Sequence, residues 1–270
     1  MTANAFEVKS VSYHYEDAAG LDGVSLTVAA GEKVALLGAN GSGKSTMLKI
    51  LDGLILPNEG TVAAFGEKLT EETLNDEGFS KAFRRRVGFV FQNPEAQLFS
   101  SSVWEEIAFG PLHLGLEHDE IITRVEDTMH ILGINHLKDR PPYHLSGGEK
   151  KKVALASVLA INPEVLLLDE PSAGLDPKTE DFLIHLISDL NRAGKTVITA
   201  TQDLGIVPQI ASRAIVLGED HRLSGAGPAG EVLGDEELLR LANLVHYHAH
   251  EHDGLRHYHP HSHVEEHDHH

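Results

Sequence analysis

The segment 38–45 constrains this chain most: it is Gly-Ala-Asn-Gly-Ser-Gly-Lys-Ser and directly follows the apolar run 34–37. A strand that ends in glycines and turns into a helix can wrap its backbone N–H groups around a phosphate chain, because glycine leaves room and the helix N-terminus is partly positive. In the pattern G-x-x-x-x-G-K-[ST], Lys44 is expected to reach the β- and γ-phosphates, and Ser45 to ligate Mg²⁺. The alternative, a glycine-rich turn without a ligand, is disfavoured by the apolar residues at 46–51, which predict the required helix. The residues expected to hold nucleotide and metal here are Gly38, Asn40, Gly41, Ser42, Gly43, Lys44, Ser45 and Thr46.

The composition narrows the choice of partners. The formal charge is −19, from 22 basic and 41 acidic residues, which argues against a general electrostatic grip on nucleic acid or anionic lipid. The chain has no cysteine, so disulfides and thiolate metal sites are excluded. The N-terminus lacks the features of a signal peptide, and no apolar stretch reaches the ~20 residues that span a bilayer. Any work at a membrane therefore requires other subunits to hold the chain there.

The hydrophobic pattern predicts an α/β fold. Short alternating runs over 6–28 indicate an antiparallel β layer ahead of the phosphate loop. Residues 69–83 are helix or loop, and 94–162 show helical periodicity with Ser102 and Ser146 as N-caps. Apolar runs that alternate with amphipathic helices indicate a parallel sheet covered on both faces. The remaining expected elements are strands at 60–66, 86–92, 165–169, 196–201 and 214–217 and a helix at 177–192.

Strand 165–169 delivers two adjacent carboxylates, Asp169 and Glu170, to its carboxyl end. In a parallel sheet that edge is where ligands bind. Because adjacent strand residues point to opposite faces, one carboxylate can face Mg²⁺ and the other an attacking water. Burial and neighbouring negative charge are expected to raise the pKa of the base. A pair that merely ends a strand is the alternative, and the phosphate loop disfavours it.

A second anion site is predicted at Leu145-Ser146-Gly147-Gly148-Glu149, which precedes a helix expected at 150–161. The order of the phosphate loop, the strand-end Gln92, this segment and the Asp-Glu strand resembles the nucleotide-binding subunit of ABC transporters over about residues 6–235. The resemblance implies a P-loop NTPase fold, with a RecA-like parallel sheet, an antiparallel β subdomain and a helical subdomain at about 94–162. It also implies a head-to-tail dimer with two ATP molecules at the interface, in which the phosphate loop of one chain faces Ser146, Gly147 and Gly148 of the other.

The same resemblance implies a role for individual residues. Tyr15 matches the aromatic residue that stacks on adenine, with Tyr13 as a near competitor. Gln92 matches the glutamine that senses Mg²⁺ and water and links the site to the transmembrane partner. Asp169 matches the Mg²⁺ ligand, and Glu170 matches the catalytic base.

Two further positions complete this comparison. Asp176, in the loop 172–176, matches the residue that joins the two sites across the dimer. Gln202 departs from the family, which usually places a histidine there against the γ-phosphate. A glutamine can donate a hydrogen bond but cannot become cationic, so the expectation is slower hydrolysis, or pairing with a different ATPase that supplies the stronger site.

Within the family, segments 92–99 and 103–111 are similar to the ATPase subunits of energy-coupling-factor transporters, with the cobalt and nickel importers as the nearest branch. This resemblance implies a groove, lined by the region 93–111, that grips a transmembrane coupling subunit, together with a substrate-capture subunit. A helix that packs only on its own domain is the alternative. The location that follows is peripheral, at the cytoplasmic face of the cell membrane, with no nucleic-acid partner.

The composition changes sharply from about residue 236, so the domain is expected to cover 1–235 and a disordered, histidine-rich tail to cover 236–270. Imidazole suits nickel, cobalt and zinc, and i, i+2 spacing in a mobile chain lets several rings converge on one ion. A solubilising tail with incidental affinity stays an alternative. The candidate ligands are His246, His248, His250, His252, His257, His259, His261 and His263.

Four functions remain open on this basis. The first is an ATP-hydrolysing subunit that powers import of nickel or cobalt. The second keeps the motor and changes the cargo to a vitamin or zinc. The third is a soluble, non-transport ABC ATPase; a metal-storage protein with vestigial ATP binding is a further possibility that requires Lys44 and Glu170 to be dispensable.

Overall fold

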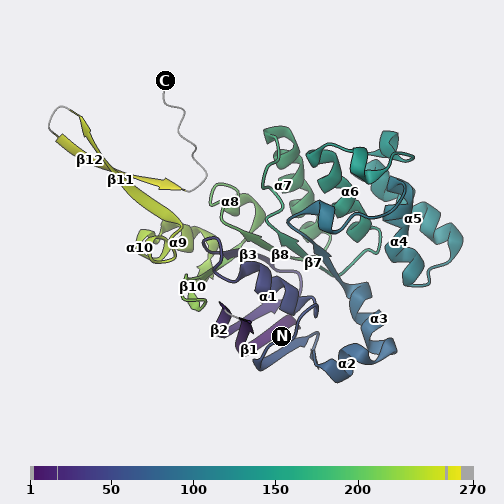
Figure 1. Ribbon diagram of the computed structural model, residues 1–270, viewed down its shortest axis with the longest axis horizontal. Coiled ribbons are helices and arrows are strands. Elements are labelled where there is room, and N and C mark those ends of the chain that lie inside the picture. The colour runs from purple at the N-terminus through teal and green to yellow at the C-terminus, as the bar shows by residue number, and fades with distance from the viewer. Residues whose placement is uncertain (1–2, 17, 253–254, 263–270) are drawn as a thin grey trace.

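The computed structural model describes residues 3–16, 18–252 and 255–262, with side chains as far as Val245. The first of its two main sheets has the order β2-β1-β4-β5 (Figure 1). All of its strand pairs are antiparallel, which confirms the β layer predicted for 6–28 and the strand expected at 60–66. Its strands are β1 (Asn4–Tyr15), β2 (Ala18–Ala29), β4 (Glu59–Ala64) and β5 (Glu67–Lys68).

The second sheet has the order β10-β9-β3-β8-β7-β6. Its strands from β9 to β6 are parallel, and β10 pairs antiparallel with β9 at the edge. Every residue of β7 and β8 is buried, as expected for strands covered on both faces. The strands predicted at 165–169 and 196–201 are confirmed, whereas β6 is shorter than the predicted 86–92. The strands are β3 (Lys33–Leu37), β6 (Val87–Val90), β7 (Val165–Asp169), β8 (Thr196–Thr201), β9 (Arg213–Leu217) and β10 (Leu223–Pro228).

Helix α1 (Lys44–Leu51) packs against β7 and β8 of one sheet and against β2 and β4 of the other. Met47, Leu48, Ile50 and Leu51 are at most 1% exposed and belong to the core between the sheets. Burying one such side chain stabilises a fold by roughly 1.5–3 kcal/mol. The helix that follows the phosphate loop is therefore anchored on both sides.

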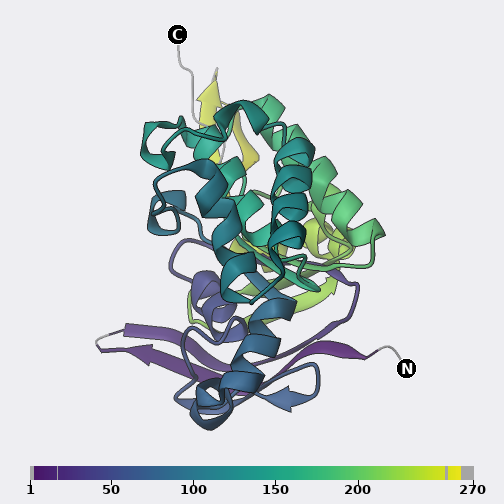
Figure 2. The ribbon, with the colours of Figure 1, turned by 90° about the vertical axis from the view of Figure 1, so that its right-hand side faces the viewer.

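A helical region forms the opposite end of the molecule from β1 and β2 (Figure 2). Its helices are α4 (Val103–His113), α5 (His118–Ile131) and α6 (Gly147–Leu159), with short 3₁₀ turns η1 (Pro94–Ala96), η2 (Asn135–Leu137) and η3 (Pro142–His144). Ser102 caps α4 and Ser146 caps α6, because each hydroxyl accepts the backbone N–H three residues later. Both predicted N-caps are confirmed.

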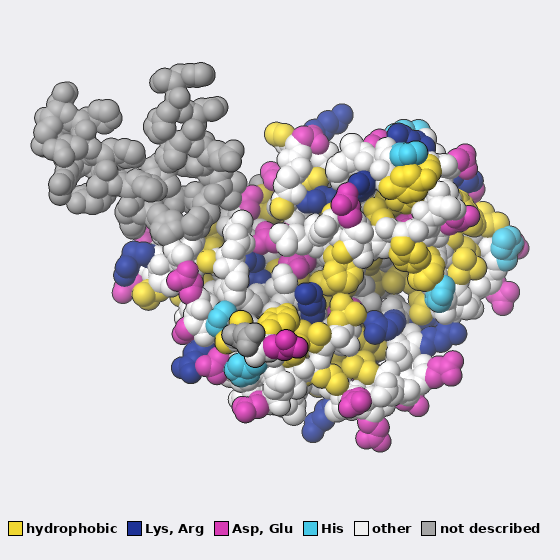
Figure 3. Space-filling view, in the orientation of Figure 1, with side chains coloured by type: hydrophobic (Ala, Val, Ile, Leu, Met, Phe, Trp, Pro, Cys, Tyr) yellow, Lys and Arg dark blue, Asp and Glu magenta, His cyan; other side chains and the backbone are white. Residues whose placement is uncertain are grey.

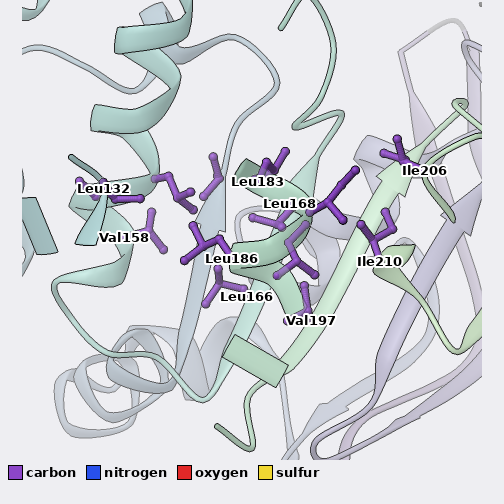
Figure 4. Packing of buried hydrophobic residues seen from close by; sticks show 14 of the residues in the cluster. Leu132, Val158, Leu166, Leu168, Leu183, Leu186, Val197, Ile206 and Ile210 are labelled. Carbon is purple, nitrogen blue, oxygen red and sulfur yellow. The ribbon is translucent and has the colours of Figure 1, made fainter. Parts of the chain in front are cut away.

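The core of this end joins the helices to the second sheet (Figure 4). Leu132 and Val158 lie on the helical side, Leu166 and Leu168 come from β7, and Leu186 comes from α7. The region predicted as helix or loop at 69–83 forms helices. The helices not yet given are α2 (Glu71–Asn75), α3 (Glu77–Arg86), α7 (Pro177–Arg192), α8 (Val207–Ile210), α9 (Ala229–Gly234) and α10 (Glu236–Leu241).

The boundary predicted at residue 235 is wrong. Leu239, Ala242 and Leu244 are at most 3% exposed and belong to the same core as α7, so the domain continues through 244. The few aliphatic residues after 236 are spaced to reach the core, and composition alone does not reveal that spacing. Two paired strands, β11 (Val245–His252) and β12 (Leu255–Ser262), follow where a disordered tail was expected.

None of the helices in the described part of the chain is long and apolar enough to cross a bilayer.

Candidate functional site

The carboxyl ends of neighbouring parallel strands bring the predicted motifs to one edge of the second sheet. Strand β3 ends immediately before the phosphate loop, β7 ends at Asp169, and β8, which lies between them, ends just before Gln202. Gln92 follows β6 at the same edge. Ligands bind at this edge of open parallel sheets, so motifs that lie far apart in the sequence form one site.

The phosphate loop depends on its glycines. Gly43 is the N-cap of α1, has a φ of 106° and supplies no side-chain cap. A Cβ atom on Gly43 would collide with the carbonyl oxygen of Gly20, and one on Gly38 would collide with the Ser42 hydroxyl. Gly41 also has a positive φ, of 84°. Because no side chain covers the first turn of α1, its N–H groups remain free to bind an anion.

Lys44 lies inside this loop and is 5% exposed. Its ammonium group donates to the carbonyl oxygens of Gly38 (2.8 Å) and Ala39 (3.1 Å). It also lies 3.4 Å from the Glu170 Oε1 atom. A lysine ammonium group beside the free N–H groups of a glycine-rich loop is an arrangement that recognises a phosphate chain. The position of Lys44 therefore fits the role predicted from the sequence.

Ser45 and Asp169 form the candidate Mg²⁺ site. The Ser45 hydroxyl donates to Asp169 Oδ1 at 3.0 Å. Asp169 is 4% exposed, and burial raises its pKa, while the Ser45 hydrogen bond and the Lys44 charge lower it. Mg²⁺ takes oxygen ligands, usually one or two carboxylates with water and phosphate. This donor set fits Mg²⁺, which when bound would neutralise charge that develops on the phosphates.

The backbone at Glu170 contradicts the prediction that Asp169 and Glu170 point to opposite faces of a strand. Strand β7 ends at Asp169, and Glu170 has a φ of 43°, so the strand alternation that would separate the two carboxylates no longer applies. Both carboxylates face the same site, one toward Ser45 and the other toward Lys44. The reason is the left-handed backbone at Glu170, a strain that folds retain mainly at functional positions.

The environment of Glu170 suits a general base. It is 7% exposed, and burial raises the pKa of its carboxyl group, while Lys44 lowers it. The charge of Asp169 makes the smallest contribution, so burial rather than the neighbouring acid is the main cause. Oε1 of Glu170 is buried, and the Lys44 ammonium group lies 3.4 Å away as its ion-pair partner. An acceptor of this kind can take a proton from water when the site holds substrate.

A cavity of about 320 Å³ opens between the phosphate loop and β2. At its side the Tyr15 hydroxyl lies 3.1 Å from Thr46 Oγ1, and Tyr15 is 44% exposed. Tyr13 instead packs edge-on against Tyr15, with 4.9 Å between ring centroids, and contacts the core. This geometry favours Tyr15 as the adenine platform. The cavity is lined by Tyr15, Ala19, Gly20, Asn40, Gly41, Gly43, Lys44, Ser45, Thr46, Gln92 and Glu170.

Gln92 and Gln202 take different positions. Gln92 is exposed and lines the cavity. Gln202 is half-buried, and its backbone N–H donates to Glu170 Oε2 at 3.4 Å. The main chain of Gln202 thus helps to hold the candidate base, a contact that any residue at this position can make. The proposed contact of its side chain with a phosphate stays a prediction.

The structure does not bring the second anion site to this cavity within one chain. Ser146 caps its own helix, with Glu149 bonded back to the Ser146 N–H at 2.8 Å, and both Ser146 and Gly147 are exposed. Asp176 caps α7. Its carboxylate accepts a hydrogen bond from the Thr179 hydroxyl, which lowers the pKa of the Asp176 carboxyl group. Their exposure leaves them free to meet a second chain, as the resemblance implies. The candidate histidine ligands at 246–263 lie outside the residues whose side chains are described.

Two residues near the site, Gly20 and Lys151, were not identified from the sequence. Gly20 lines the cavity, and a Cβ atom there would lie 3.1 Å from the Tyr15 ring; a glycine inside a strand beside an aromatic residue was the available signal. Lys151, on α6, donates to the carbonyl oxygens of Pro171 and Ala173 beside Glu170. Burial lowers its pKa, and no sequence signal distinguishes it from its neighbours Lys150 and Lys152.

Comparisons with known proteins agree with this geometry. Residues 21–173 match the family model described as ABC transporter. The chain is 50% identical over 244 residues to the nickel import ATP-binding protein NikO of Rhodobacter capsulatus, covering 89% of this chain and 96% of that protein. It is 43% identical over 239 residues to the energy-coupling factor transporter ATP-binding protein EcfA of Methanothermobacter thermautotrophicus, covering 88% and 75%.

Solved structures are similar as well. The structure of cbiO1 from Clostridium perfringens, part of the ABC transporter complex cbiONQ, is 37% identical with a TM-score of 0.75 and covers 90% of this chain and 95% of that chain. A dimeric ATP-binding cassette in a post-hydrolysis state bound to ADP and Pi is 29% identical with a TM-score of 0.76, covering 83% and 98%. Because the family model covers more than half of the chain and the relatives extend over most of it, the chain belongs to the ABC transporter family and is an ATP-hydrolysing subunit of such transporters.

Proposed function

We propose that this subunit powers import of a divalent transition metal, nickel or cobalt, through membrane partner subunits. The observation that carries the choice of cargo is the 50% identity with a nickel import ATP-binding protein, which extends over 96% of that protein. The similarity to cbiO1 of the cbiONQ complex points the same way. A tail rich in imidazole fits a protein that works near such ions.

The site supports a hydrolysis cycle in which each residue has one task. The loop N–H groups and Lys44 bind the β- and γ-phosphates. Ser45, Asp169 and Gln92 would hold Mg²⁺ through oxygen atoms. Glu170 takes a proton from water as the water oxygen bonds to the γ-phosphorus and the bond to the bridging oxygen of ADP breaks. Gln202 offers an amide hydrogen bond in place of a cation.

A second ATPase subunit completes the site in this proposal. Ser146, Gly147 and Gly148 begin a long helix at the surface, and their N–H groups would face the phosphates bound to the neighbouring chain. Asp176 lies at the start of α7 and is exposed, where it would contact that neighbour. The partner would be a second copy or a related ATPase.

Contacts with membrane subunits are supported by apolar side chains that the helical region leaves exposed. Phe99 is 67% exposed, Leu112 54% and Tyr143 70%. A hollow of about 540 Å³ lies between η1, η3 and α6, with Phe99 and Tyr143 on its walls. Figure 3 shows hydrophobic side chains gathered on the part of the surface that the helical region forms. A helix of a transmembrane coupling subunit, itself joined to a substrate-capture subunit, would dock here, and the chain would lie peripherally at the cytoplasmic face of the membrane.

Capture of the chain from gently solubilised native membranes tests the proposal. The co-purifying subunits are identified, and ATP hydrolysis by that complex is measured with nickel, cobalt, zinc and no added metal. We expect membrane subunits and stimulation by nickel or cobalt. Recovery of soluble partners alone would refute the transport role and favour a non-transport ATPase, whereas membrane partners with stimulation by zinc or a vitamin would overturn only the cargo.

A further inference from the structure

The C-terminal segment forms a two-stranded antiparallel hairpin. Strands β11 and β12 pair without a register shift from Val245 opposite Ser262 to His252 opposite Leu255. The connection at 253–254 lies outside the described residues. The hairpin extends away from the sheets and helices beyond α10 (Figure 1). Its register is therefore set by its own pairing and not by packing on a sheet.

This register places histidines opposite histidines. The directly opposed positions are His246 and His261, His248 and His259, and His250 and His257. The three pairs are two residues apart along each strand, so they share one face of the hairpin. The sequence alone shows only i, i+2 spacing, whereas the pairing shows that histidines from both strands meet at the same levels.

The other face has a different composition. Its opposed positions are Val245 and Ser262, Tyr247 and Pro260, Ala249 and Tyr258, and Glu251 and Arg256. The last of these combines opposite charges, and an aromatic residue opposite a small one is an ordinary cross-strand pair. Over the three opposed pairs, one face therefore carries histidines only and the other face carries none. The next position on the histidine face, His252, lies opposite Leu255.

The chemistry of this face follows from general geometry. Directly opposed residues of an antiparallel pair have Cβ atoms about 4.5–5.5 Å apart, a separation over which two imidazoles can share an ion. Neutral imidazole binds nickel, cobalt, copper and zinc, and is a poor ligand for Mg²⁺. An isolated two-stranded hairpin is marginally stable in water, so binding of an ion across its strands would also stabilise the pairing.

We propose that the three opposed histidine pairs of β11 and β12 form a binding site for divalent transition-metal ions. The juxtaposition that carries the proposal is His246, His248 and His250 opposite His261, His259 and His257. The site lies beyond the last core residue, Leu244, and shares no residue with the ATP site. It therefore exists whether or not metal is the transported cargo.

Calorimetric titration of the full-length chain without nucleotide tests this site. The titrants are NiCl₂, CoCl₂, ZnCl₂ and, as the negative reference, MgCl₂ at pH 7.5. We expect saturable binding of the first three ions and none of Mg²⁺. Absence of nickel, cobalt and zinc binding at pH 7.5 would refute the proposal.

Variants separate opposed pairs from mere histidine content. His248→Asn combined with His259→Asn removes one full pair and should lose much of the binding, whereas His252→Asn removes an unpaired histidine and should leave binding nearly unchanged. Exchange of two neighbours, Tyr247→His with His248→Tyr, keeps the composition and moves one imidazole to the other face.

We expect this exchange to weaken binding, because it leaves His259 without an opposed histidine. Binding equal to that of the parent would show that histidine content alone is responsible. A loss with His252→Asn as large as the loss with the pair variant would equally overturn the proposal. Backbone amide exchange over 245–262 gives an independent readout, because an ion held across the strands slows exchange in both β11 and β12.

Discussion

Replacement of Asp52 by asparagine should make the stability of this protein less dependent on pH. Asp52 is the C-cap of α1 and is 6% exposed, with Arg84 Nη1 at 3.8 Å as its ion-pair partner. Burial raises the pKa of Asp52 from 3.8 to about 7, and Arg84 opposes that rise only in part. The folded protein therefore holds a proton at Asp52 that the unfolded chain releases at lower pH.

This difference in pKa sets the sign and size of the change in unfolding free energy with pH. Stability from the protonated carboxyl group is fully present below pH 4 and is lost as the pH rises through 7. A shift of about 3 pH units corresponds to at most about 4 kcal/mol. Between pH 5 and pH 8 the part that is lost is about 2.5 kcal/mol. An asparagine of similar shape carries no charge at either pH, so the variant avoids this loss.

Urea unfolding of parent and variant at pH 5 and pH 8 measures the effect. At each pH, the unfolding free energy of the parent is subtracted from that of Asp52→Asn. This difference should be about 2.5 kcal/mol larger at pH 8 than at pH 5. Steric effects of the substitution cancel in this comparison. Asp139→Asn, at an exposed position, is the control for removing one carboxylate from the chain. Equal differences at both pH values would refute the reasoning.

Three predictions concern the ATP site. In the dimeric ATPase, Glu170→Gln should keep ATP binding and lower the rate of hydrolysis roughly 10²–10⁴-fold, as measured by phosphate release; turnover at the parent rate would exclude Glu170 as the base. Gly43→Ala should abolish nucleotide binding and lower the melting temperature, because its Cβ atom would strike a backbone carbonyl of β2. Gly133→Ala, at a φ of 66° in open space, isolates the cost of backbone strain, and equal effects on nucleotide affinity would contradict this account. Tyr15→Ala should weaken ATP binding in a fluorescence titration while Tyr143→Ala leaves it intact; the reverse order would show that adenine stacks elsewhere.

Local signals were sufficient for most elements. The strands at 165–169 and 196–201 and the helix at 177–192 match the structure because uninterrupted apolar runs and a Pro at the start of a helix are strong, local patterns. The caps at Ser102 and Ser146 were equally readable, since hydroxyl capping depends on residues only three positions apart.

Features that depend on contacts between residues far apart in the sequence could not be predicted from local patterns. The change of composition at residue 236 predicts the end of the domain there, yet Leu239, Ala242 and Leu244 reach the core. Likewise, strand alternation suggested opposite directions for Asp169 and Glu170. The chain leaves the β conformation at Glu170, and a change of one backbone angle is invisible in the residue types.

What the sequence determined by itself is the chemistry: glycines where backbone must approach phosphate, a lysine and a serine after them, and two acids at the end of an apolar strand. These follow from the intrinsic properties of residues next to one another. What only the tertiary structure decided is which of these groups meet. Ser45 contacts Asp169 and Lys44 contacts Glu170 because β8 lies between β3 and β7 and aligns their ends, an order that long-range strand pairing sets.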